Sequence, residues 1–110
     1  MMKKIPLLLV FSLLAACSSM GVDSNSKAKK TADIYLEAGT ESLYQGRYTD
    51  ALNSLSEALK YDPKSTIILN NLALAYVGKE KEKLAEDTWK KTLALDPNFS
   101  DARNNLGFLY

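Results

Sequence analysis

The chain has 110 residues, 46% of them hydrophobic, and its 14 Lys and Arg nearly balance its 13 Asp and Glu, for a formal net charge of +1. This length allows one small domain, and the balanced charge lacks the basic surface that a nucleic-acid partner would need. The chain has no histidine and a single cysteine. Serine–histidine catalysis and an internal disulfide are therefore excluded, and the commonest metal ligand is missing.

The first 16 residues have the three parts of a secretory signal peptide. Lys3 and Lys4 carry the positive charge, residues 5–14 form an apolar run, and Ala15 and Ala16 are the small residues of a cleavage site. The apolar run is too short for a transmembrane helix, which takes about 20 residues. We therefore interpret residues 1–16 as an export signal.

Cys17 follows these alanines, and Leu14-Ala15-Ala16-Cys17 resembles the lipobox of bacterial lipoproteins. The resemblance implies that the peptide is cut before Cys17, that its thiol is joined to diacylglycerol and that the new amino group is acylated. Apart from this covalent lipid, no cofactor or metal is expected. Ser18, where retained lipoproteins carry aspartate, implies sorting to the outer membrane. The alternative is an ordinary signal peptide with a chance cysteine nearby.

Residues 17–31 are predicted to be the lipidated N-terminus and a flexible linker. They are rich in serine and poor in apolar side chains, so they cannot bury enough surface to offset the entropy of ordering. Lys27, Lys29 and Lys30 at the end of this segment are interpreted as part of a solvated linker, with contact to anionic lipid as the alternative.

From residue 32 onward the sequence repeats with a period of 34 residues. Asp62-Pro63 recurs as Asp96-Pro97, and Asn70-Asn71-Leu72 recurs as Asn104-Asn105-Leu106. Apolar residues within each period are spaced three or four apart, which is typical of amphipathic helices. A period of this length predicts stacked helical hairpins. The repeats are assigned to 32–65, 66–99 and a partial 100–110.

In register with this period, the chain resembles the tetratricopeptide repeat (TPR) family. The matching positions are Tyr35, Gly39, Ala51, Leu55, Ala58 and Pro63 in repeat one, Leu72, Ala73, Tyr76, Ala85, Trp89 and Pro97 in repeat two, and Leu106, Gly107 and Tyr110 in repeat three. The resemblance implies an all-α solenoid of about two and a half TPR hairpins over residues 32–110. Helices are expected at 33–44, 48–60, 66–77, 82–94 and 100–110.

Several local features are predicted within this solenoid. Gly39, Ala73 and Gly107 should let paired helices approach closely, and Tyr110 should fill space between helices. Ser100 is a plausible N-cap of the fifth helix. Because the chain ends inside repeat three, we expect an amino-terminal fragment of a longer array, with a fifth helix that serves as its own cap as the alternative.

A TPR solenoid offers a concave groove lined by the first helix of each hairpin. By the resemblance, the groove positions flanked by Asp33 and Asp101 are Leu36, Thr40, Leu43, Ile67, Asn70, Leu74, Val77, Asn104 and Phe108. The two asparagines are expected to bond a ligand backbone, while Leu74 and Phe108 hold its side chains. The alternative is that several of these residues pack against a continuation of the solenoid.

No catalytic motif occurs in the sequence, so the protein is predicted not to be an enzyme but a protein-interaction module. A lipid-anchored TPR domain looks like the type IV pilus biogenesis lipoproteins (pilotins). That resemblance implies binding to the pilus secretin at the periplasmic face of the outer membrane, with the membrane reached through the lipid. The alternatives are a scaffold for peptidoglycan enzymes and a structural subunit of an outer-membrane assembly complex. The oligomeric state is left open.

Overall fold

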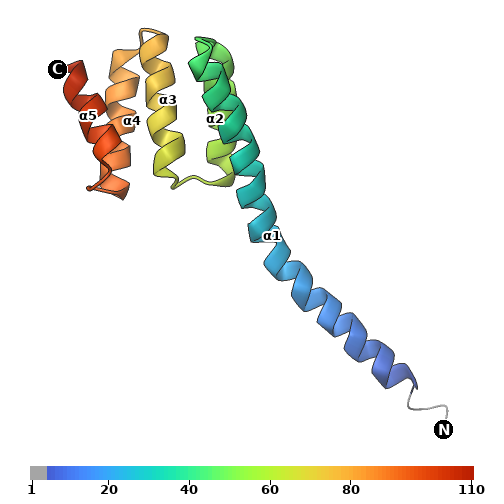
Figure 1. Cartoon of the computed structure of the whole chain (residues 1–110). Coiled ribbons are helices and arrows are strands. Elements are labelled where there is room, and N and C mark those ends of the chain that lie inside the picture. Colours follow the sequence, from blue (N-terminus) through green and yellow to red (C-terminus); the bar gives the residue numbers. More distant parts are fainter. Residues whose placement is uncertain (1–4) are drawn as a thin grey trace.

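The computed structural model describes residues 5–110, and it describes side chains from Ser24 onward. This part of the chain consists of α-helices and turns, without any strand (Figure 1). The helices are α1 (Ile5–Tyr44), α2 (Tyr48–Tyr61), α3 (Thr66–Gly78), α4 (Glu82–Leu95) and α5 (Ser100–Leu109). The predicted all-α fold of helical hairpins is therefore confirmed, and both ends of each helix from α2 to α5 lie within one residue of the prediction.

The helix ends follow from the residues found there. Asp62 and Asp96 are the C-caps of α2 and α4, both with φ near −140°, because the proline that follows each of them disfavours helical geometry. Ser65 is the N-cap of α3, and its hydroxyl accepts a hydrogen bond of 3.3 Å from the backbone N–H of Ile68. The Asp-Pro pairs thus end each hairpin and set the period of the solenoid.

Helix α1 begins at Ile5 rather than near residue 33, so residues 24–31 are helical where the sequence predicts a flexible linker. Once Ala32 is buried against the domain, each preceding residue extends an existing helix without a new nucleation step. Lysine and alanine, which dominate residues 27–30, are good helix formers. The domain bounds 1–16, 17–31 and 32–110 stay predictions.

No helix in the described part of the chain is both long and apolar enough to cross a bilayer.

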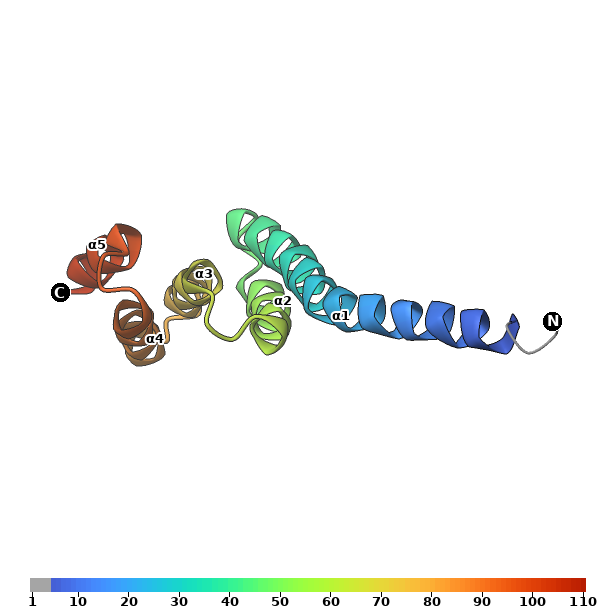
Figure 2. The same cartoon turned by 90° about the horizontal axis from the view of Figure 1, so that it is seen from below.

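The helices form two layers. Helices α1, α3 and α5 lie along one side, and α2 and α4 lie along the other (Figure 2). Ala51 and Leu55 of α2 are buried with Leu72 and Ala75 of α3, and a second cluster joins α3, α4 and α5. Small side chains at these contacts let the helices pack closely. The first helix of every hairpin is thereby placed on one face, as the predicted groove requires.

Two of the predicted close approaches have different outcomes. A Cβ at Gly39 would lie 2.6 Å from Leu55 Cγ, so this glycine is required where α1 meets α2. A Cβ at Gly107 would meet nothing within 4 Å, because α5 has no second helix of its hairpin within this chain. The prediction for Gly107 is therefore wrong for these residues.

The two hairpin turns share one unusual backbone position. Gly46 has a φ of +72°, and Glu80, 34 residues later, has a φ of +58°. Glycine adopts this left-handed conformation freely, whereas glutamate adopts it at a cost of about 1–2 kcal/mol. The glycine of repeat two lies at Gly78 instead, since a Cβ there would lie 2.2 Å from Tyr48 Cδ1. Packing of the tyrosine ring thus explains why this glycine precedes the turn.

The start and end of α5 differ from the prediction. The N-cap is Phe99, whose backbone is extended and whose side chain packs against the cluster around Trp89. Ser100 is the first helical residue, so its predicted capping role is wrong. Tyr110 is 81% exposed and does not fill space between helices; its hydroxyl donates a hydrogen bond to Glu86 Oε1.

Candidate binding groove

The face formed by α1, α3 and α5 carries two pockets. The C-terminal pocket, of about 460 Å³, lies where α3 and α5 meet α4 and contains three of the predicted groove residues. Its lining is Leu74, Val77, Glu82, Trp89, Asn105, Phe108 and Leu109. Phe108 is 92% exposed and Val77 is 37% exposed. The pocket therefore offers apolar side chains to a partner beside a single charged group, Glu82.

The floor of the C-terminal pocket is fixed by a buried polar contact. Trp89 Nε1 donates a hydrogen bond of 2.8 Å to Asn70 Oδ1, and Asn105 Nδ2 donates one of 3.1 Å to the same oxygen. Trp89 is 2% exposed and Asn70 is 7% exposed. The side-chain oxygen of Asn70 therefore holds α3, α4 and α5 together. The prediction that this amide bonds a ligand backbone is not supported for its oxygen, because the two internal donors already occupy it.

A second asparagine joins the preceding pair of groove helices. Asn71 Nδ2 donates a hydrogen bond of 3.0 Å to Thr40 Oγ1, which links α3 to α1. Asn71 and Asn105 occupy equivalent positions one 34-residue period apart. In each case the asparagine amide reaches back to the groove helix of the previous hairpin. Thr40, predicted to face a ligand, thus has an internal partner.

The N-terminal pocket, of about 790 Å³, runs along α1. It is lined by Asp33, Ile34, Leu36, Glu37, Ala38, Thr40, Glu41 and Tyr44. Ile34 is 66% exposed and Tyr44 is 85% exposed. Sequence reasoning selected Leu36 and Thr40 here but missed Ile34, Glu37 and Tyr44, because the family pattern places them outside the groove. The signal that was available is the presence of large apolar side chains on both sides of one short helix.

The remaining predicted groove residues differ in their surroundings. Leu43 is half-buried and packs against the cluster around Leu55, so its role is mainly structural. Ile67 and Asn104 are exposed but line neither of the two pockets. The structure thus gathers part of the predicted set at each pocket and leaves these residues outside both.

Charged groups are concentrated beside the C-terminal pocket. Lys90 Nζ lies 2.8 Å from Glu86 Oε1, which confirms the predicted surface ion pair. The hydrogen bond from Lys90, then that from Tyr110, lowers the pKa of Glu86 from its ordinary value of 4.5 to about 2. Among the residues that the structure describes, no group of His, Cys, Asp and Glu could hold a metal ion.

The predicted lipidation site is not tested by the structure. The side chain of Cys17 lies outside the described residues, which include side chains only from Ser24 onward. Acylation of Cys17, and the signal peptide cleavage that would precede it, stay predictions.

Comparisons with known proteins agree with the fold. Residues 39–79 match the family model of the TPR repeat. Photosystem I assembly protein Ycf3 of Synechococcus sp. (strain CC9605) is 33% identical over 89 residues, which cover 78% of this chain and 51% of that protein. Photosystem I assembly protein Ycf3 of Prochlorococcus marinus (strain MIT 9303) is 30% identical over 105 residues, covering 91% and 59%. The chain spans about half the length of the curated relatives it matches. Its hairpins are tandem TPR units, a fold that implies protein partners.

These relatives overturn the predicted biological setting. They carry the name of a photosystem I assembly protein, whereas the sequence analysis assigned the chain to type IV pilus biogenesis. The assignment to pilotins, and with it the secretin partner, is therefore wrong. The outer-membrane location and its periplasmic face rested on the same assignment and are wrong on the same finding. The error arose because a TPR motif reports a packing solution that many unrelated assembly systems use.

Proposed function

We propose that this chain is a non-catalytic TPR module that binds a segment of a partner protein on the face formed by α1, α3 and α5 while a larger complex is assembled. The exposure of Phe108 at the C-terminal pocket carries this proposal. A phenylalanine that is 92% exposed beside an apolar pocket gains about 1.5–3 kcal/mol when a partner covers it. Helical solenoids present such surfaces to extended or helical segments of other proteins.

The assembly role is supported by the names of the relatives, each a photosystem I assembly protein. A module that holds one subunit until the next arrives needs an open groove and no reactive group, and both pockets fit that description. Photosystem I subunits are accordingly the first partners to test.

The experiment is titration of the full chain with individual photosystem I subunits, followed by calorimetry. We expect at least one subunit to bind and Phe108→Ser to weaken its binding by about tenfold or more, since 1.4 kcal/mol corresponds to tenfold. Leu84→Ser is the matched control, because Leu84 is a partly exposed apolar residue of α4 that lines neither pocket. Its affinity should stay within about twofold of the wild-type value. Equal losses for both variants, or no binding by any subunit, would contradict the proposal.

A further inference from the structure

The carboxylates of this protein are not distributed evenly between its two faces. The two pockets on the α1, α3 and α5 face contain Asp33, Glu37, Glu41 and Glu82, and neither pocket contains a lysine or an arginine. Both pockets also contain exposed apolar side chains. This combination gives the face a negative charge next to apolar surface.

The carboxylates of the opposite layer are neutralised by the chain itself. Apart from Glu82, every carboxylate of α2 and α4 lies within 4.0 Å of a lysine or arginine nitrogen; these are Asp50, Glu57, Glu86 and Asp87. By contrast, Glu37 and Glu82 have no ion pair and no hydrogen bond within the described residues. The pocket carboxylates thus remain available to charges that the chain does not supply.

The geometry of α1 sets the spacing that a partner would meet. Asp33, Glu37 and Glu41 are four residues apart, so they follow one side of α1 over about 12 Å. Asp33 is partly compensated by Lys29 at 3.8 Å, which leaves Glu37 at the centre of the row without a partner. Ile34 and Tyr44 lie beside this row in the same pocket. A segment with basic residues one helical turn apart and apolar residues between them would match both features.

We infer that the segment bound on this face is a cationic amphipathic helix of the partner protein, with Lys or Arg directed to Glu37 and Glu82 and apolar side chains seated beside Phe108 and Ile34. This inference rests on the proposed function and specifies the chemistry of its ligand. The same negative face disfavours nucleic acids and anionic membranes, which carry negative charge themselves.

The test uses three labelled peptides of about 16 residues, a length at which helices begin to form. Each has leucine at helical spacing, and the polar positions are lysine in the first peptide, glutamine in the second and glutamate in the third. Fluorescence anisotropy with the full chain should give tightest binding for the lysine peptide. Its advantage should shrink as salt is raised, because exposed charges are screened beyond about 8–10 Å near physiological ionic strength.

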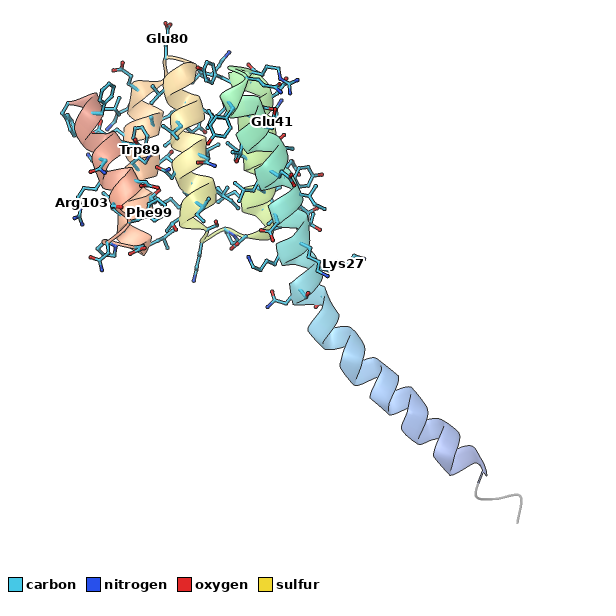
Figure 3. All side chains as sticks on the ribbon, viewed as in Figure 1. Lys27, Glu41, Glu80, Trp89, Phe99 and Arg103 are labelled. Carbon is cyan, nitrogen blue, oxygen red and sulfur yellow. The ribbon has the colours of Figure 1, made fainter. Side chains whose placement is uncertain are left out.

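Matched variants separate local contacts from overall charge. Glu37→Gln and Glu82→Gln should each weaken binding of the lysine peptide by about two- to fivefold and leave the glutamine peptide unaffected. Glu80→Gln removes the same charge at the α3–α4 turn, where Glu80 points away from the helices (Figure 3). Its effect should be smaller than that of either pocket variant.

The outcomes distinguish this inference from the proposed function. If the glutamine or glutamate peptide binds as tightly as the lysine peptide, or if Glu80→Gln weakens binding as much as Glu37→Gln, the inference is wrong and the groove itself is unaffected. If Phe108→Ser leaves binding of the lysine peptide unchanged, the groove of the proposed function is wrong. Absence of binding by all three peptides would contradict both.

Discussion

The hydrogen-bond acceptor Asn70 is the residue whose replacement should have the clearest effect on this fold. Asn70→Ala removes the oxygen that accepts from both Trp89 Nε1 and Asn105 Nδ2. Trp89 is 2% exposed, so its indole N–H cannot turn to water after the change. Asn105 is only partly buried, and its amide can find a water molecule instead.

The expected destabilisation follows from these two bonds. A buried donor that loses its partner costs about 1–3 kcal/mol, and the loss of a partly exposed hydrogen bond costs about 0.5–1.5 kcal/mol. We expect Asn70→Ala to lower the free energy of unfolding by about 2–3 kcal/mol. For a domain of this size that corresponds to a fall in Tm of about 10–20 °C. Asn71→Ala, which removes only the bond to Thr40, should cost about 0.5–1.5 kcal/mol.

Urea unfolding monitored by fluorescence measures these values directly, because Trp89 is the only tryptophan of the chain. A double-mutant cycle with Trp89→Phe, which lacks the N–H, should give a coupling energy between positions 70 and 89 of about 1–2 kcal/mol. The reasoning would be refuted if Asn70→Ala unfolded within about 0.5 kcal/mol of the wild type. A larger loss for Asn71→Ala than for Asn70→Ala would refute it equally.

Two further predictions concern a glycine pair and a carboxylate. Gly39→Ala should destabilise the protein by about 1–2 kcal/mol, because the new Cβ collides with the buried Leu55 and overpacking outweighs the gain in helix propensity, whereas Gly107→Ala, which meets open space, should stabilise it by up to about 1 kcal/mol; thermal melts of both variants check the opposite signs. The pKa of Glu86 falls on folding from 4.5 to about 2, so its ionised form stabilises the fold above pH 4.5 and this contribution is lost as the pH falls toward 2. The Tm values of the wild type and Glu86→Gln should therefore converge over that interval, and a difference that stayed constant would contradict the bond from Lys90.

The sequence was sufficient to predict most of the fold because its signals are local. The Asp-Pro pairs end helices through proline sterics, which act on the adjacent residue whatever the rest of the chain does. The extent of α1 was not predicted, since residues 24–31 are polar enough to read as linker and become helical only by extension from a docked helix. Ser100 failed as a cap because packing of Phe99 decided where the chain enters α5.

The candidate site was predicted only in part, and the reason lies in side-chain contacts across repeats. The family pattern placed Asn70 on the groove, but it did not show that Trp89 and Asn105 would occupy its oxygen. Nor did it show that Glu37 and Glu82 lack partners, which depends on how lysines and arginines are arranged on neighbouring turns. The biological setting was wrong for a different reason, since repeat motifs encode packing and not the identity of the partner.

The two asparagine bridges make the groove mechanically uneven. Both join the inner edges of successive first helices, but the bridge at Asn70 is buried and shares its acceptor with Trp89, whereas the bridge from Asn71 to Thr40 is a single, partly buried bond. When a bulky partner forces the helices apart, the weaker bridge opens first. The solenoid will therefore bend between its first and second repeats, and the hairpin formed by α1 and α2 will swing as a hinged arm against a stiff C-terminal half.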